Sequence, residues 1–207
     1  MLRVIDHQNR RAHADLLRAM HRDRKRLFVD RFGWDLFHEG GEERDAFDGD
    51  DAVYLVLAGP GDEHLASLRV LPTDRPHLLD SVFPHLCDGP VPRGPTVREI
   101  TRLCLPVGRR AAVRRAARNL LARGIVDYAR AQGVSAYTVV CNLGFLNDLY
   151  AAGWRCEALG APQAVAGALA GAARISVDPD THDRFAPDWR CDPAGPRLSC
   201  VPDKLAA

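Results

Sequence analysis

The chain has 207 residues, enough for one hydrophobic core of ordinary size, and this predicts a single domain over residues 1–207. Hydrophobic and charged contents of 46% and 27% are typical of a soluble globular protein, and a net charge of +1 offers no bulk field for nucleic acid. No apolar run approaches the roughly 20 residues of a membrane span, and the N-terminus lacks a signal-peptide core.

Cysteines and histidines show no metal-ligand spacing. The six cysteines also lack the pattern of a disulfide framework, which suits a reducing compartment. We therefore expect a cytoplasmic protein without a metal site. The cysteines are Cys87, Cys104, Cys141, Cys156, Cys191 and Cys200.

A short strand and a long helix open the chain. Met1 to Ile5 alternates enough to predict a strand, and His13 to Phe37 has apolar residues at three- and four-residue steps that predict helix for most of its length, with Gly33 at its end. Trp34 to Asp51 is expected to be a loop rich in carboxylates and aromatics. A loop of this length indicates that it covers a site.

A hairpin is predicted next. Ala52 to Ala58 and Leu65 to Leu71 form its strands, and Gly59 to Asp62 forms its turn. Arg69 lies in the middle of the second strand, where an unpaired guanidinium would be costly, so we expect it to have a carboxylate partner. Pro76 to Leu86 favours a short helix.

Val97 to Pro106 predicts a strand buried on at least one face, because alternate positions carry β-branched or aliphatic residues. These positions are Val97, Thr101, Leu103 and Leu105. Glu99 shares their parity, which turns a carboxylate toward the core unless a cleft opens there. Arg102 has the opposite parity, so it can share a site with Glu99 only through a bulge. The alternative is an ion-paired glutamate without chemistry.

The strongest helix signal lies between Gly108 and Gly133, and its first half is rich in arginine. Val134 to Cys141 predicts a strand, Leu143 to Ala152 a helix ended by Gly153, and Trp154 to Leu159 another strand. After Gly160 the pattern decays, with one further strand at Ala173 to Val177. This order predicts an α/β fold with a mixed sheet and helices on both faces.

Several conspicuous residues recur in an order typical of one family. They are Arg24, Phe28 and Trp34 in RKRLFVDRFGW, Asp45 and Asp48 in ERDAFDGDD, Arg69 in ASLRVLPT, and Glu99 and Arg102 in REITRLCLP. Together they resemble the acyl-homoserine-lactone synthases, the autoinducer synthases of bacterial quorum sensing. The resemblance covers residues 1–158 and includes SVFP at Ser81 to Pro84, while residues 159–207 are a less certain C-terminal part.

The resemblance implies a GNAT-like three-layer α-β-α sandwich whose mixed central sheet is splayed near the acyl site. It also implies a reaction. The α-amine of S-adenosylmethionine attacks an acyl thioester, and the acylated product cyclises to a lactone with loss of methylthioadenosine. S-adenosylmethionine is then a substrate, and no cofactor is expected.

Roles for individual residues follow from the resemblance. Glu99 is expected to be the base for the amine, with Arg102 beside it, although a close arginine would weaken that base. Phe28 and Trp34 are expected to form an aromatic wall for the sulfonium. The other residues expected at the S-adenosylmethionine site are Arg24, Asp45, Asp48 and Arg69, with Asp48 and Arg69 forming a pair. A purely structural role is the alternative for Phe28 and Trp34, as core residues, and for the pair of Asp48 and Arg69.

Acyl recognition is expected from two sets of residues. The pocket candidates are Leu103, Val140, Cys141, Leu149 and Trp154, and the donor-docking candidates are Arg109, Arg110, Arg114, Arg115 and Arg118. A family threonine linked to 3-oxo chains has its nearest counterpart in Thr138, one or two places early, which argues against a 3-oxo product. The missing glycine-rich loop favours an acyl-carrier protein over coenzyme A, and the arginines could serve either donor.

Two other functions are compatible with these residues. One is a GNAT-type N-acyltransferase that uses acyl-CoA on another amine, and the other is a non-catalytic binding protein of the same fold. Neither the acyl group nor the oligomeric state follows from the sequence.

Overall fold

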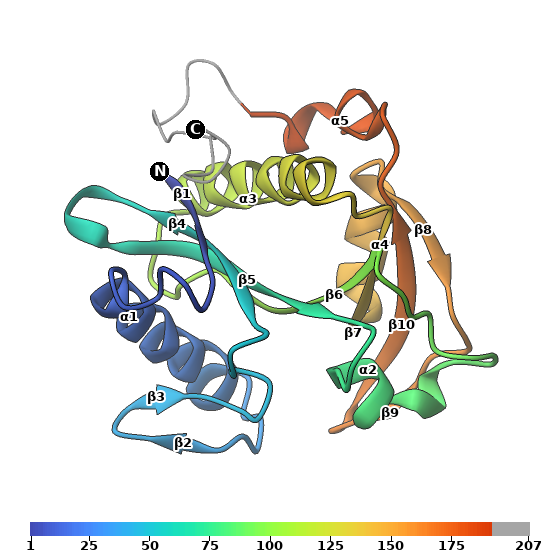
Figure 1. Cartoon of the computed structure of the whole chain (residues 1–207), viewed down its shortest axis with the longest axis horizontal. Helices are drawn as coiled ribbons and strands as arrows, with labels where there is room; N and C mark the ends of the chain where they lie inside the picture. Colours follow the sequence, from blue (N-terminus) through green and yellow to red (C-terminus); the bar gives the residue numbers. More distant parts are fainter. Residues whose placement is uncertain (192–207) are drawn as a thin grey trace. The chain divides into compact units, whose positions relative to one another are not determined.

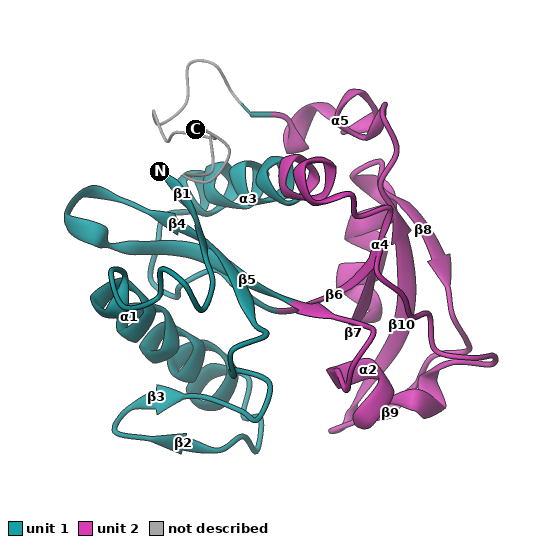
Figure 2. Ribbon diagram, viewed as in Figure 1, with its two compact units in different colours: residues 1–70, 102–125, 191–207 teal, residues 71–101, 126–190 magenta. Residues whose placement is uncertain are grey.

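The structure is a computed structural model that describes residues 1–191. These residues form two compact units (Figure 2). Unit 1 comprises Met1–Val70, Arg102–Ile125 and Cys191, and unit 2 comprises Leu71–Thr101 and Val126–Arg190. That residues 1–207 form a single domain stays a prediction. Of the six cysteines, Cys200 lies outside the described residues. Within residues 1–191, none of the helices has the length and apolar character needed to span a membrane.

Unit 1 contains an antiparallel set of three strands. β1 (Leu2–Ile5) pairs with β4 (Val53–Ala58), and β4 pairs with β5 (His64–Pro72) through the short helical turn η2 (Pro60–Asp62). The predicted hairpin is therefore confirmed. In the β4–β5 register Tyr54 lies opposite Arg69, so both side chains point to the same side of the strands.

Two helices cover these strands. α1 (Ala14–Arg24) continues directly as a π-helical segment, η1 (Lys25–Arg31). The first part of α3 (Ala111–Gln132) lies on the other side of the unit 1 strands from α1 (Figure 1). Gly124 allows α3 to approach β1, because a Cβ atom there would lie 2.0 Å from Cδ2 of Leu2.

Part of the segment expected to be a loop forms a hairpin instead. β2 (His38–Glu39) pairs with β3 (Glu42–Glu43) across Gly40 and Gly41. Both glycines have positive φ, 57° and 80°, which a two-residue type I′ turn requires at both central positions. The loop prediction for Trp34 to Asp51 was wrong at this point, although the Gly-Gly pair was a visible hairpin signal.

Unit 2 contains the mixed part of the sheet. β6 (Val97–Cys104) runs parallel to β7 (Ala136–Asn142), and β10 (Ala168–Ser176) runs antiparallel to β7. β10 also pairs with β8 (Arg155–Ala158) and β9 (Gln163–Val165). The helical elements that lie wholly in unit 2 are α2 (Leu78–Ser81), η3 (Pro84–Leu86), α4 (Leu143–Ala151), α5 (Thr181–Arg184) and η4 (Pro187–Trp189).

β10 corrects the expectation that order decays after Gly160. The strand has nine residues and lies between β7 and β8, so its small side chains are partly buried rather than in a loop. It turns back to β9 at Ala166 and Gly167, which have φ values of 47° and 80°. The alanine-rich sequence hid the strand, because alanine and glycine carry little strand preference.

The predicted alternation of buried and less buried side chains along β6 is observed only as far as Thr101. Val97, Glu99 and Thr101 are buried, whereas Arg102 has a φ of 51° and breaks the pattern. Beyond it Cys104 is buried, and Leu103 and Leu105, expected on the buried face, are only half-buried. A bulge was expected here if Arg102 was to share a site with Glu99. In the structure, Arg102 itself has a left-handed backbone conformation. The ladder with β7 ends at the pair Ile100 and Val139.

The helix expected at Pro76 to Leu86 is split into two short pieces. α2 covers Leu78–Ser81 and η3 covers Pro84–Leu86. Proline lacks the N–H that a continuing helix needs, so Pro84 begins a new turn instead of extending α2.

Candidate functional site

Unit 1 holds a buried network of three arginines and three carboxylates. Arg24 on α1 is 1% exposed, and its Nε lies 2.6 Å from Oε2 of Glu43. Its two terminal nitrogens donate to both oxygens of Asp48 at 2.8 and 2.9 Å. This bidentate geometry is the strongest arrangement between a guanidinium and a carboxylate. Arg24 therefore ties the helix to two points of the acidic segment, Glu42 to Asp51.

Arg69 and Arg102 complete the arginine–carboxylate network. Arg69 is fully buried and donates to Asp45 at 2.5 and 3.0 Å and to Asp48 at 2.8 Å. This confirms both the expected carboxylate partner and the pair with Asp48. Arg102 donates to Glu43 at 3.0 Å and lies 2.7 Å from Asp45. These ion pairs hold Arg102 in its uncommon positive-φ conformation.

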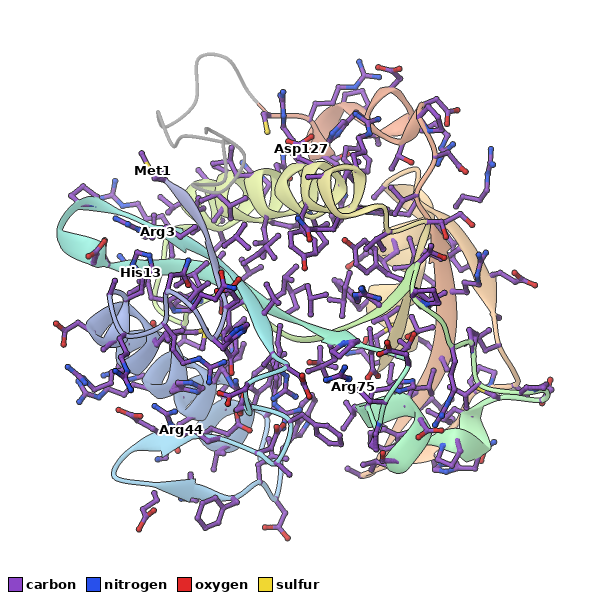
Figure 3. The ribbon with its side chains drawn as sticks, viewed as in Figure 1. Met1, Arg3, His13, Arg44, Arg75 and Asp127 are labelled. Atoms are coloured by element: carbon purple, nitrogen blue, oxygen red, sulfur yellow. The ribbon has the colours of Figure 1, made fainter. Side chains whose placement is uncertain are left out.

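Hydrogen bonds within the acidic segment fix its carboxylates. The backbone N–H of Asp45 donates to Asp48 at 2.8 Å, and that of Phe47 donates to Asp45 at 2.9 Å. The hydroxyl of Tyr54 donates to Asp48 at 2.7 Å. By contrast, Arg44, labelled in Figure 3, is exposed and bonds to Glu42. The three carboxylates of the network are thus matched by three guanidinium groups, which keeps the buried charge balanced.

The network shifts the pKa values of Asp48 and Arg24. Burial alone would raise the pKa of Asp48, but the hydrogen bonds and charge of Arg24, together with the charge of Arg69, outweigh it and lower that pKa. Burial would lower the pKa of Arg24, whereas its bonds to Asp48 and Glu43 raise it. Asp48 and Arg24 therefore remain ionised near neutral pH, as an ion pair held inside the network.

His21 lies against this network and remains neutral. Its ring is 1% exposed, Nδ1 lies 2.9 Å from the carbonyl oxygen of Glu43, and the ring meets Tyr54 edge-on. Burial, followed by the nearby charge of Arg24, lowers its pKa from 6.5 to about 4. A protonated His21 would be a further buried cation beside Arg24.

A pH-dependent loss of stability should follow from His21. Between pH 6.5 and about 4 the unfolded chain binds a proton that the folded chain does not, so the free energy of unfolding falls as pH falls. We expect His21 to contribute about 2 kcal/mol of this loss between pH 7 and pH 5. Urea unfolding at pH 7 and at pH 5 measures the fall in the free energy of unfolding between them. This fall should be smaller for His21→Gln than for the wild type, and it should equal that of the wild type for the exposed control His7→Gln. An equal pH dependence in His21→Gln would contradict this assignment.

An aromatic cluster follows the π-helical segment. Phe28 and Trp34 stack with centroids 5.1 Å apart, and Phe32 packs against both. Phe28 is buried and lies 5.7 Å from the guanidinium carbon of Arg102, whereas Trp34 is 41% exposed. The structure therefore brings the two predicted aromatic residues together and links them to the network through Arg102.

Glu99 lies in unit 2 and is fully buried. Its Oε2 accepts the N–H of Leu78 at 2.7 Å and its Oε1 accepts the N–H of Leu79 at 2.8 Å. These two bonds fix the orientation of the carboxylate. Arg98, the preceding residue on β6, donates to the carbonyl oxygens of Pro95 and Val97.

The parallel register places Thr138 directly opposite Glu99. Thr138 is fully buried, and its hydroxyl oxygen has no hydrogen-bond partner among the described residues. Thr138 lies one or two places before the family position in the sequence, and strand pairing nevertheless sets it opposite Glu99. The expectation against a 3-oxo product stays a prediction.

The acyl-pocket candidates fall into separate groups. Val140 packs against a buried cluster of Leu79, Leu86 and Ala172. Leu149 and Trp154 lie together, because the backbone N–H of Trp154 donates to the carbonyl oxygen of Leu149. The ring centroid of Trp154 lies 4.8 Å from that of Phe185.

The two remaining acyl-pocket candidates lie in different units. Burial raises the pKa of the Cys141 thiol in unit 2 to about 12, so this cysteine is a side chain for packing rather than a nucleophile. Leu103 belongs to unit 1 and is half-buried.

The candidate docking arginines differ in their contacts. Arg109 lies 2.6 Å from Glu63, and Arg114 donates to the carbonyl oxygens of Leu105 and Pro106. Arg118 bonds to the side chain of Asn119. Arg110 and Arg115 are exposed, and their side chains make no ion pair or hydrogen bond within the described part of the chain. These last two are therefore best placed to meet a ligand.

Sequence reasoning missed Glu43, which is fully buried and contacts both Arg24 and Arg102. The available signal was the Gly-Gly pair, because a hairpin there fixes which of Glu42 and Glu43 turns inward. It also missed Leu79 and Leu86, since their apolar cluster forms only after the chain folds.

Comparison with known proteins assigns the chain to a family. The family model for autoinducer synthase matches residues 7–185. An acyl-homoserine-lactone synthase of Rhizobium radiobacter is 30% identical over 186 residues, covering 87% of this chain and 85% of that protein. An isovaleryl-homoserine lactone synthase of Bradyrhizobium diazoefficiens is 30% identical over 208 residues, covering 97% and 93%.

The fold agrees with this assignment. A CoA-dependent acyl-homoserine lactone synthase, BjaI, solved with SAM and isopentyl-CoA, superposes with a TM-score of 0.83 at 29% identity over 97% of this chain and 96% of that one. A putative N-acetyltransferase from Lactobacillus plantarum, 16% identical with a TM-score of 0.57 over 86% and 99%, shares the fold alone. The expected GNAT-like α/β class is confirmed. The chain belongs to the autoinducer synthase family.

Proposed function

We propose that this chain makes an N-acyl-L-homoserine lactone from S-adenosylmethionine and an acyl-CoA thioester. The observation that carries the proposal is the arginine–carboxylate network, in which residues expected at the S-adenosylmethionine site are buried and joined to one another. The CoA donor is supported by likeness along nearly the whole chain to a CoA-dependent synthase. An acyl-carrier protein is the alternative donor that the missing glycine-rich loop favours.

Asp45 is the member of the network proposed to meet the substrate. Its side chain is 21% exposed, compared with 5% for Asp48 and 0% for Glu43. Its oxygens already accept bonds from Arg69 and face Arg102, but a carboxylate offers about four acceptor positions and can also receive an ammonium or ribose hydroxyl. The stacked Phe28 and Trp34 supply an aromatic surface suited to a sulfonium.

Glu99 is proposed to take the proton that the amine must lose before it attacks the thioester. The buried cluster of Leu79, Leu86 and Ala172, with Val140 packed against it, is proposed to hold the acyl chain, because Leu79 also donates its N–H to Glu99. Lactone formation then needs no further base, since the substrate carboxylate displaces methylthioadenosine. We place this chemistry in the cytoplasm, without a resident cofactor.

A thermal-shift experiment tests the proposed substrate. S-adenosylmethionine at 100 times its Kd should raise the Tm of the wild type by about 5 °C or more. Asp45→Asn should reduce this shift, because it removes one charge-assisted contact, and the exposed control Glu39→Gln should keep it. A chain stabilised by coenzyme A but not by S-adenosylmethionine would instead be an N-acyltransferase for another amine.

Two exposed arginines at the start of α3, one just before the helix and one in its first turns, are proposed to bind the phosphates of the donor. Charge reversal at Arg110 and Arg115 should raise KM for acyl-CoA by roughly 10-fold at low salt, and less at high salt. KM for an acyl-pantetheine, which lacks those phosphates, should not change. Arg123→Glu, farther along α3, is the matched control. Equal effects on both donors, or none, would remove this role from Arg110 and Arg115.

A further inference from the structure

His77 is a buried imidazole that the proposed mechanism does not use. It directly precedes α2, and its side chain is fully shielded from solvent. Nδ1 lies 3.0 Å from the carbonyl oxygen of Arg75, a residue labelled in Figure 3. A carbonyl only accepts hydrogen bonds, so Nδ1 carries the hydrogen and a neutral ring presents its lone pair at Nε2. Nε2 is buried and has no hydrogen-bond partner within residues 1–191.

Two further residues with buried polar side chains are linked to the start of α2. Glu99 accepts the N–H groups of Leu78 and Leu79, the two residues that follow His77. Thr138 lies opposite Glu99 in the strand register, and its hydroxyl is also without a partner. A buried acceptor without a partner costs about 1–3 kcal/mol. One such atom belongs to His77, which precedes the two residues that bind Glu99, and the other belongs to Thr138, which pairs with Glu99 in the strand register. This arrangement indicates a place built for a polar ligand.

The acylation moves two protons off the amine nitrogen, and Glu99 is proposed to take only the first. An ammonium that becomes an amide loses two protons, while the thioester releases a thiolate. Glu99 takes the first proton and frees the amine lone pair. The second proton leaves the nitrogen as the N–C bond forms, and the thiolate must gain a proton as the C–S bond breaks. One group that accepts at nitrogen and donates at sulfur completes the balance.

We propose that His77 Nε2 is this group, accepting the second amine proton and passing it to the departing sulfur. His77 ends neutral, Glu99 ends protonated and returns its proton to water, and the products are the amide and a free thiol. The hydrogen bond from Nδ1 to Arg75 fixes the tautomer that this transfer needs. The inference rests on the proposed function, since it assigns a second proton acceptor to the same acylation.

The leaving group provides the test. In His77→Gln, kcat with acyl-CoA should fall roughly 10²-fold, because an alkyl thiolate leaves poorly without a proton. With the corresponding thiophenyl ester, whose thiol is much more acidic, the loss should be only a few-fold. His85→Gln is the matched control, since His85 is exposed and lies in the neighbouring turn η3. An equal loss with both esters, or no loss, would overturn the assignment.

Two further measurements distinguish a failure of the inference about His77 from a failure of the proposed function. If the wild type releases no methylthioadenosine with any donor, the proposed function fails and the inference fails with it, whereas an active wild type beside an unaffected His77→Gln overturns the inference alone. If His77→Gln does not fold, the ¹⁵N NMR signals of the wild-type imidazole decide. A hydrogen on Nδ1 supports the proposal, and a hydrogen on Nε2 overturns it.

Discussion

Glu99→Gln is expected to lower kcat for lactone synthesis by roughly 10²-fold or more, with the apparent affinity for S-adenosylmethionine nearly unchanged. Glutamine keeps the size of the side chain but cannot take a proton from the amine near neutral pH. Initial rates of methylthioadenosine release at saturating acyl-CoA would measure the change. Turnover near the wild-type rate would remove the role of base from Glu99.

A structural effect of the same substitution must be separated from a chemical one. Glu99 accepts two backbone N–H groups, and glutamine can replace only one of its oxygens as an acceptor. Rates should therefore be compared at a temperature where circular dichroism shows the variant fully folded. Glu157→Gln on β8 is the control, because it makes the same change at an exposed carboxylate in unit 2.

Arg24→Met is expected to reduce the free energy of unfolding by about 3–5 kcal/mol. The guanidinium of Arg24 is 1% exposed and is shared between Glu43 and Asp48, whose side chains are 0% and 5% exposed. Removing it leaves two buried carboxylates short of a cation, and methionine fills the volume without replacing the charge. Urea unfolding at pH 7 measures the difference.

A neighbouring arginine on the same helix provides the control for Arg24. Arg22 is 55% exposed, and its Nε lies 3.8 Å from Oε1 of Glu42. Ion pairs at exposed positions such as this one contribute little to the free energy of unfolding. Arg22→Met should change the unfolding free energy by less than about 1 kcal/mol. A loss for Arg24→Met as small as that for Arg22→Met would show that the network does not stabilise unit 1.

Regular periodicity made most of the fold predictable. The β4–β5 hairpin, the long α3 and the strand at β6 follow repeats of apolar residues that burial itself imposes. Elements without such repeats were missed. β2 and β3 have only two residues each, and β10 is built of alanine and glycine whose burial depends on β7 and β8.

The candidate site was predictable where local rules apply. A mid-strand arginine requires a carboxylate, which gave Arg69 its partners, and parity turned Glu99 inward. Glu43 and His77 were missed, and the position of Thr138 opposite Glu99 was not foreseen, because these environments depend on a hairpin turn, a short helix and a strand register. Such contacts between distant parts of the chain leave no pattern in the neighbouring sequence.

The most direct test of the account follows the atoms of S-adenosylmethionine into the product. Purified protein given acyl-CoA and S-adenosylmethionine labelled with ¹³C in its methionine carbons should release methylthioadenosine and a labelled acyl-homoserine lactone in equal amounts by mass spectrometry. Acyl transfer to S-adenosylmethionine without the lactone, or no labelled product with any acyl-CoA or acyl-carrier protein, would contradict it.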